Sequence, residues 1–356
     1  MSTQKVDATP ERISELAALI QSRMHGSLKD IQAINTQVRI LSVNAQIEAA
    51  RAGNAGRSFG VVASSMGDLS RRTADVAEGL ASGMQADIQE LSTISKRLAR
   101  DVRGQRLADL ALTNIDLIDR NLYERTCDVR WWATDASLVQ ACENPEQQDI
   151  VRHASHRLGV ILDAYTVYYD LVLCTLDGHV LANGRPTQYN SKGMDVSDQT
   201  WFSAAMRSAS GDEYGFKTVH ESQLVGGHRI LTYSCGVRAN GDSNGALIGV
   251  LGILFNWDAL AQTIVHNTPL SVEEKSMTRA LIIEDDGMVL ADTSERILKE
   301  RIEFKELPQL LSQKKGHISA TLHGSPAIIA HALSPGYETY ATGWHSLLIQ
   351  NTKQSA

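Results

Sequence analysis

Residues 10–105 carry hydrophobic side chains at alternating steps of three and four, a spacing typical of a coiled-coil seam with a repeat of about 3.5 residues. The first stripe is Ile13, Ala17, Ile20, Met24, Ile31, Ile34, Val38, Leu41 and Ala45. The second is Phe59, Val62, Met66, Leu69, Thr73, Val76 and Leu80. Between them, Gly53 and Gly56 can take the positive φ angles of a tight reversal. The pattern predicts an antiparallel helical hairpin whose second helix runs at least to Arg103.

A helical pattern resumes at Arg106 and ends before Pro145, so we expect Gly104 to be a weak break. A further helix is expected over residues 149–165. The hydrophobic period then changes to two. Residues 171–183 are typical of a β-hairpin that turns at Asp177–Gly178.

The strand pattern occurs twice. The first round continues with a short helix over residues 198–208, strands at 216–221, 229–237 and 246–256, and a helix at 258–266. The second round opens with a hairpin over residues 280–291, which turns at Asp286–Gly287, and continues with strands at 317–322, 325–333 and 343–350. This is an approximate internal repeat, and it predicts two antiparallel sheets.

The predicted fold class is α+β, with a coiled-coil hairpin, a long helix and two small antiparallel sheet modules in chain order. Its expected segments are a tail at 1–9, the hairpin at 10–105, connecting helices at 106–165, sheet modules at 166–268 and 269–350, and a tail at 351–356.

Composition narrows the function. A net charge of −7 without a basic cluster argues against a nucleic-acid partner. No apolar run reaches the length of a membrane span, and the N-terminus has no signal-peptide core, so we expect a cytoplasmic protein. The four cysteines have neither metal nor redox spacing, and no catalytic motif is present. We therefore expect no metal, no cofactor and no enzymatic activity.

Residues 44–63, NAQIEAARAGNAGRSFGVVA, resemble the tip of the signalling domain of methyl-accepting chemotaxis receptors at fourteen of twenty positions. The resemblance implies a homodimer that forms a four-helix bundle. It also implies a tip that contacts a coupling protein, a histidine kinase and other chemoreceptors. The tip residues that it assigns are Asn44, Glu48, Arg51, Gly53, Gly56, Arg57, Phe59 and Val62.

Four positions depart from that family's pattern: Thr36, Arg39, Ser65 and Gly67. Thr36 stands where the family has a Phe that helps to pack dimers into trimers. The hairpin does not depend on these positions. The first arm is also too short to reach the family's methylation region, and Gln89–Glu90 is the one pair of that type on the second arm. We expect a receptor-like protein that is not adapted by methylation.

Residues 106–350 resemble the double Cache module, a PAS-like ligand-binding sensor domain of bacterial receptors. Residues 195–202, DVSDQTWF, are similar to the family's entry to the pocket helix, and residues 249–254 to its core strand. The resemblance implies a site for an unidentified small molecule in the first module. Its candidate ligand-binding residues are Asp195, Gln199, Trp201, Phe202, Tyr214 and Tyr233. The alternative for Trp201 and Phe202 is that they are ordinary core residues.

Members of that family that bind α-amino acids use an Arg, a Tyr and an Asp at positions that here read Gln199, Met194 and, approximately, Leu254. Without these charges the carboxylate and ammonium groups of an amino acid have no partners. We therefore predict that the protein does not bind α-amino acids in that way.

The leading hypothesis is a chemoreceptor-like signal transducer of bacterial chemotaxis. It would sense a small molecule through the Cache module and signal through the hairpin tip. The alternative is an adaptor or decoy that joins receptor clusters without binding a ligand. A third hypothesis, an enzyme on the PAS-like fold, is disfavoured because no nucleophile–base pair or metal spacing supports it.

Overall fold

A computed structural model describes residues 10–322 and 324–352. The predicted tail at residues 1–9, and residues 353–356 of the predicted C-terminal tail, lie outside these ranges. The chain divides into two compact units, Met1–Arg103 and Gly104–Ala356, and each is described by itself.

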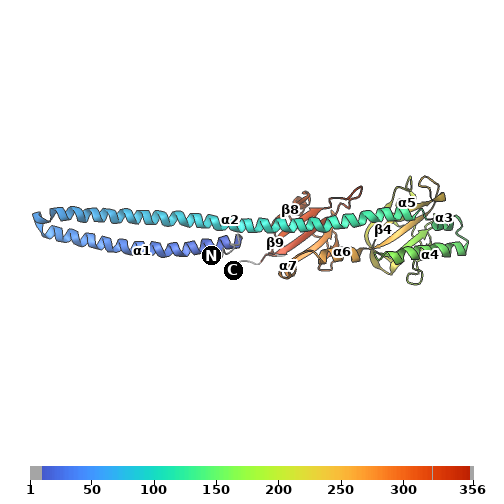
Figure 1. Ribbon diagram of the computed structural model, residues 1–356, viewed down its shortest axis with the longest axis horizontal. Coiled ribbons are helices and arrows are strands. Elements are labelled where there is room, and N and C mark those ends of the chain that lie inside the picture. The colour runs from blue at the N-terminus through green and yellow to red at the C-terminus, as the bar shows by residue number, and fades with distance from the viewer. Residues whose placement is uncertain (1–9, 323, 353–356) are drawn as a thin grey trace, which may run out of the picture. The chain divides into compact units, whose positions relative to one another are not determined.

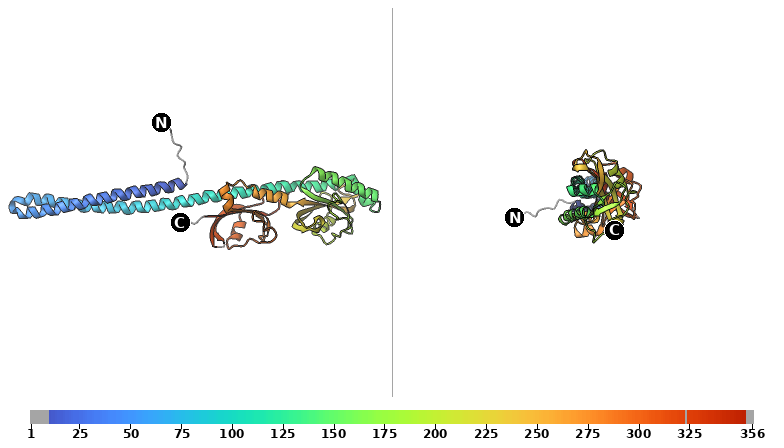
Figure 2. Two further views of the ribbon diagram at one scale, coloured as in Figure 1. Left: turned by 90° about the horizontal axis from the view of Figure 1, so that it is seen from below. Right: turned by 90° about the vertical axis from the view of Figure 1, so that its right-hand side faces the viewer.

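The first unit is a helical hairpin. Helix α1 (Pro10–Arg51) is followed by a 3₁₀ turn η1 (Gly53–Gly56) and by α2, which begins at Arg57 and ends at Trp132. The two helices lie side by side and antiparallel over this unit (Figures 1 and 2). Near the turn, the Ser42 hydroxyl donates to the carbonyl oxygen of Ala63 at 2.7 Å. Near the open end, Ser14 donates to Ser95 at 3.1 Å.

Small side chains, with Leu28 and Ile88, form the seam between the two helices. Its buried residues are Ala17, Leu28, Ser42, Ala63, Ser70, Ala77, Ile88 and Ser95. Much of the predicted stripe faces outward instead: Leu41, Leu69 and Val76 are 59%, 61% and 70% exposed. Assigning these larger residues to the seam of the hairpin was wrong. Serine and alanine let the backbones approach closely, and the larger residues form a second apolar stripe beside the seam.

Helix α2 is continuous through Gly104, so the predicted break there is wrong. Glycine is favoured at position 104 for another reason: a Cβ there would collide with the imidazole ring of His317. The helical pattern that was expected to reach Pro145 is also divided. Helix α2 ends at Trp132, and α3 (Ala136–Glu143) starts after Asp135, whose carboxylate caps it by accepting from the Ser137 amide at 2.8 Å.

Helix α4 (Gln148–Ala164) leads into the first antiparallel sheet, whose strand order is β2-β1-β5-β4-β3. The strands are β1 (Tyr168–Cys174), β2 (Val180–Asn183), β3 (Gly215–Ser222), β4 (His228–Arg238) and β5 (Leu247–Asn256). Helix α5 (Thr200–Met206), two 3₁₀ turns, η2 (Gln223–Val225) and η3 (Ala239–Gly241), and α6 (Trp257–His266) complete this module.

The second sheet repeats this topology as β7-β6-β10-β9-β8. Its strands are β6 (Thr278–Ile283), β7 (Val289–Asp292), β8 (Lys315–Leu322), β9 (Ser325–Leu333) and β10 (His345–Asn351). Two short helices accompany them, α7 (Val272–Met277) and α8 (Leu307–Leu311). Strand β10 therefore includes Asn351, which was predicted to lie in the tail. The predicted α+β class, with a long helical region before two antiparallel sheets, is confirmed.

One hydrophobic core joins the two sheets of the second unit to helix α2. Leu107, Ile115, Ile118 and Leu122 of α2 are fully buried in it. In Figures 1 and 2 the two sheets follow one another along this part of α2. The opposite face of each sheet carries a separate core, and these two outer faces are where the modules differ.

Candidate functional site

The turn of the hairpin presents most of the predicted tip residues to solvent. Glu48, Arg51 and Phe59 are exposed, and Arg51 donates to the Glu48 carboxylate at 2.9 Å. Gly53 has a φ of 60°, and a Cβ on Gly56 would collide with the carbonyl oxygen of Ala49. The two glycines therefore permit the tight reversal, while the charged and aromatic side chains around it are exposed to solvent.

The remaining tip residues also have exposed side chains around a closely packed turn. Asn44, Arg57 and Val62 are exposed, whereas Gly56 is buried. One divergent position has a local explanation: a Cβ on Gly67 would come within 3.0 Å of the Ser42 hydroxyl oxygen. Glycine at 67 thus belongs to the close packing of the seam.

In the first sheet module, the candidate aromatic residues are core. Trp201 and Phe202 of α5 are 1% and 4% exposed, and they pack on the outer face of the sheet with Val172, Leu254 and other buried residues. A Cβ on Gly252 would lie 2.9 Å from the Trp201 ring, so this glycine admits the indole against the strand. The aromatic pair is thus buried between α5 and the outer face of the sheet.

The other four candidates do not join them in one pocket. Tyr233 is fully buried in the core on the helix side of the sheet, where Tyr214 packs against it, because successive residues of a strand point to opposite faces. The Tyr233 and Tyr340 hydroxyl groups are 2.6 Å apart. Asp195 is exposed and accepts from the backbone amide of Ser197.

Gln199 has a cationic neighbour that the sequence analysis missed. Lys217 of β3 donates to the Gln199 side-chain oxygen at 2.8 Å. The two residues are far apart in the sequence and on different elements, so only the pairing of α5 with β3 could have indicated this contact. Gln199, which stands where the amino-acid-binding members have an Arg, therefore has a positive charge nearby.

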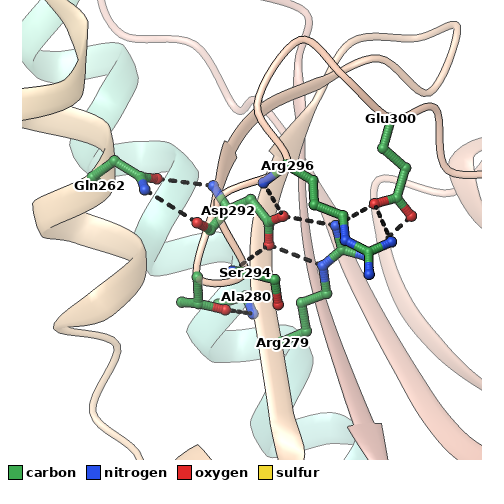
Figure 3. Close-up of polar contacts among 8 residues, drawn as sticks. Gln262, Arg279, Ala280, Asp292, Ser294, Arg296 and Glu300 are labelled. Carbon is green, nitrogen blue, oxygen red and sulfur yellow. Dashed lines mark hydrogen bonds and ion pairs between the residues drawn. The ribbon is translucent and has the colours of Figure 1, made fainter.

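The second module holds a buried ion network that the sequence analysis also missed (Figure 3). Arg279 of β6 donates to both oxygens of Asp292, through Nε at 2.9 Å and Nη2 at 2.7 Å. It also donates to both oxygens of Glu300, at 3.2 and 2.8 Å. Asp292 accepts two further hydrogen bonds, from the backbone amides of Ser294 and Arg296. The guanidinium thus lies between two carboxylates.

The network shifts the ionisation of its members. Burial raises the pKa of the fully buried Asp292, but the hydrogen bonds from Arg279, Ser294 and Arg296 outweigh it, so the pKa lies below its ordinary value. The hydrogen bond from Arg279 likewise lowers the pKa of Glu300. The same bond to Asp292 raises the pKa of Arg279. All three groups are therefore charged near neutral pH.

Cavities lined by described residues border this module, and two of them have charged walls. The first, here called the Arg279 cavity, has a volume of about 800 Å³, and its walls include Lys275, Arg279, Arg301, Glu300 and Glu303. Cations and anions are mixed along its walls, and serine and threonine residues add hydroxyl groups. Its charges give no preference for one sign of ligand.

The second, here called the acidic cavity, has a volume of about 680 Å³. Its walls are Asp285, Asp286, Ile302, Glu303, Phe304, Leu307, Pro308, Leu311, Leu333, Gly343 and His345. His345 lies between Asp285, 2.9 Å from its Nε2, and the buried His331, 2.7 Å from its Nδ1. Burial, together with His345, lowers the pKa of His331 to about 4. Among residues 10–322 and 324–352, no group of three His, Cys, Asp or Glu side chains is placed to hold a metal ion.

The chain matches two protein families. Residues 63–355 match the Cache domain, and residues 2–119 match the signalling domain of methyl-accepting chemotaxis proteins. Both a signalling domain and a Cache sensor domain are therefore present, and the two matches overlap on helix α2.

Curated relatives are similar over part of the chain. The methyl-accepting chemotaxis protein TlpQ of Pseudomonas aeruginosa is 40% identical over 115 residues, which cover 28% of this chain and 16% of TlpQ. The methyl-accepting chemotaxis protein PcaY of Pseudomonas putida is 25% identical over 195 residues, which cover 54% of this chain and 32% of PcaY. The chain thus spans at most about a third of these relatives' lengths.

Solved sensor domains share the fold. The ligand-binding domain of the Pseudomonas aeruginosa amino-acid chemoreceptor PctC, in complex with GABA, has a TM-score of 0.50 at 17% identity and covers 70% of this chain and 99% of its own. The sensor domain of the Vibrio cholerae histidine kinase DctB has a TM-score of 0.47 at 11% identity and covers 75% of this chain and 100% of its own.

These similarities contradict the expected cytoplasmic location. The Cache match covers residues 63–355, most of the chain, and a sensor domain of this type points to a membrane receptor. Within residues 10–322 and 324–352, no helix has the length and apolar character needed to cross a bilayer.

Proposed function

The chain belongs to the Cache domain family, and from that premise we propose that it is a signal transducer of the chemoreceptor type. The Cache unit senses a small molecule, and the hairpin carries the signal to a coupling protein and a histidine kinase. The observation that carries this proposal is the presence of both domains in one chain, sharing helix α2. A helix common to sensor and hairpin can transmit a small shift or rotation.

The tip residues support the signalling role. Glu48, Arg51, Phe59 and Val62 are exposed around a turn whose glycines keep it tight. The exposed Phe59 and the exposed Glu48–Arg51 pair offer both apolar area and charge to a partner. We propose these residues, together with Asn44 and Arg57, as the contact surface for the kinase, the coupling protein and neighbouring receptors.

The outward apolar stripe supports a homodimer. On α2, beyond the tip residues, it includes Leu69, Val76 and Leu80, all at least 49% exposed in the single chain. Large apolar side chains repeated at heptad spacing along a soluble helix indicate a helical partner. A second copy would cover this stripe and complete a four-helix bundle.

The test is a pull-down with the coupling protein and histidine kinase of the organism that carries this chain. The test variant is Glu48→Ala with Arg51→Ala, and the matched control is Arg12→Ala with Glu15→Ala, an ion pair of the same spacing far from the tip. We expect the wild type and the control to retain both partners and the tip variant to lose them. Retention by the tip variant, or no retention by the wild type, would refute the tip assignment.

A second candidate function is an adaptor that joins receptor clusters without sensing. The filled first module favours it, because Trp201 and Phe202 occupy the face where a ligand was predicted. An adaptor would bind the same partners, so ligand titrations separate the two functions. A ligand that saturates the Cache unit would support the sensor.

A further inference from the structure

We propose that the acidic cavity of the second module binds an organic cation with an apolar body, such as an alkylammonium ion. The inference deepens the proposed sensing function and rests on it. The ligand class follows from the cavity's size, its charges and its walls. The predicted site was in the first module, so this cavity is a different site.

The cavity has the size and lining of a small-molecule site. Its volume of about 680 Å³ lies within the range of about 300–1,000 Å³ typical of ligand pockets. Ile302, Phe304, Leu307, Leu311 and Leu333 provide apolar walls. In the first module, by contrast, Trp201 and Phe202 fill the outer face of the sheet.

The charged residues of the wall are all acids. Asp285, Asp286 and Glu303 carry carboxylates, and no Lys or Arg lines the cavity. Asp286 is paired with Arg301, whereas Glu303 has no ion pair within the described part of the chain. The Asp285 side chain is 84% exposed, and its one described partner is His345. The Glu303 carboxylate and the Asp285 oxygen that does not contact His345 thus remain for a ligand.

Asp285, His345 and His331 form a hydrogen-bonded series, here called the histidine chain, and its last member, His331, adds no charge. His331 is fully buried, and with a pKa lowered to about 4 it is neutral at physiological pH. Its Nδ1 has no hydrogen-bond partner among the described residues. His345 thus contacts Asp285 from the protein side of the cavity, and the residue that His345 contacts in turn, His331, is not a cation.

These features favour one ligand chemistry over others. An anion would meet like charges, and a neutral apolar molecule would leave the carboxylates unused. A bare metal ion needs several oxygen or nitrogen ligands, and no described group of three suitable side chains is placed to supply them. An ammonium group can lie between Asp285 and Glu303 and near the Phe304 ring, while its alkyl chain packs on the leucines.

The experiment is isothermal titration of the full chain with hexylammonium chloride, beside sodium hexanoate and 1-hexanol as ligands of equal length. We expect saturable binding of hexylammonium at one site and none of hexanoate. Asp285→Asn and Glu303→Gln are each expected to weaken binding about tenfold, the factor for one charge-assisted contact. Glu146→Gln removes the same charge from an exposed site between α3 and α4 and should leave binding unchanged.

A second variant tests the cavity itself. Leu311→Trp, which adds bulk to the α8 wall, should abolish hexylammonium binding, and the circular-dichroism melting curve reports whether the chain still folds. No binding to the wild type, equal binding of hexanoate, or full binding by the double variant Asp285→Asn/Glu303→Gln would overturn the proposal. Each of these failures would leave the pull-down result intact, so it would not be mistaken for a failure of the tip assignment.

Discussion

The two sheet modules share one topology, but the polar side chains that bridge their first two strands differ in charge. Strand β1 pairs with β2 so that Val172 faces Asn183, and β6 pairs with β7 so that Leu281 faces Asp292. Asp170 and Arg279 lie two residues before these partners. In the first module Asp170 accepts from Asn183 at 2.7 Å, whereas in the second Arg279 donates to Asp292 at 2.7 Å.

The residues at equivalent positions thus carry opposite charges, Asp170 in the first module and Arg279 in the second. In the first module one buried carboxylate accepts hydrogen bonds from Asn183 and three backbone amides, without a cation. Burial raises the pKa of Asp170, against the effect of these bonds. In the second module a guanidinium joins two carboxylates. A duplicated fold therefore tolerates either sign, provided that each buried charge has its own set of partners.

The outer faces differ as well. In the first module Trp201 packs against Gly252 on the outer face, whereas the described residues of the second module border the Arg279 cavity and the acidic cavity. The comparison thus sets an outer face packed by Trp201 in one module against an outer face bordered by cavities in the other. The following substitutions test that contrast, beginning with the largest expected effect.

Trp201→Ala would open the first module. Removing a fully buried indole should lower the free energy of unfolding by about 3 to 5 kcal/mol, because the transfer energy is lost and a cavity remains. Urea denaturation measures it. Trp131→Ala is the control, since that side chain is 70% exposed and its loss should change stability little. Equal effects of the two substitutions would contradict a closed first module.

Asn183→Asp places a second carboxylate against Asp170. Because no cation compensates the pair, we expect a loss of about 3 kcal/mol at neutral pH. The two carboxylates would share a proton, so the pKa of the pair in the folded state would be raised further. The loss should therefore shrink as the pH falls toward 4. Urea denaturation at pH 7.5 and pH 4.5 gives both values, and a loss that does not depend on pH would argue against like-charge repulsion.

Asp292→Asn is the reciprocal change in the second module. It removes one of the two anions that face Arg279, and we expect a loss of about 2 to 3 kcal/mol, since Glu300 still partners the guanidinium. Thermal or urea unfolding measures it. This loss should also shrink in acid, but for a different reason. The pKa of Asp292 is lowered in the folded wild type, so the wild type's advantage should disappear as the pH falls through the folded pKa. An advantage that persists in acid would contradict the ion-pair account.

His331→Gln tests the histidine chain. The pKa of His331 is about 4 when folded and about 6.5 when unfolded, so acid favours the unfolded chain between these values. This single group should lower the wild type's stability by about 2 kcal/mol between pH 7 and pH 5. Glutamine keeps an NH donor near His345 and does not titrate. Urea midpoints at the two pH values should therefore differ less for the variant, and an unchanged difference would refute the assignment.

Part of this architecture could be predicted from the sequence. Period-two patterns and the Asp-Gly turns located both sheets, and the glycines at 53 and 56 located the reversal of the hairpin. The seam of the hairpin could not be located in this way. Heptad spacing marks the largest apolar residues, such as Leu41 and Leu69, but small residues such as Ser42 and Ala63 allow the closest approach and were buried instead.

The candidate ligand site was less accessible to sequence reasoning. Trp201 and Tyr233 look like one aromatic lining, but strand alternation places Tyr233 on the opposite face. The cavities of the second module depend on how completely side chains fill space, which no local pattern encodes. The Arg279–Asp292 pair had one usable signal, because the repeated Val-Leu-Ala motif aligns Asp292 with Asn183.

The most direct test of the central claim is the autophosphorylation rate of the histidine kinase, assayed with its coupling protein and this chain. If the chain is a chemoreceptor-type transducer, the wild type will change the rate. The Glu48→Ala/Arg51→Ala variant will leave it at the level of kinase and coupling protein alone. A rate that the wild type does not alter, or that both chains alter equally, would contradict the proposed signalling function.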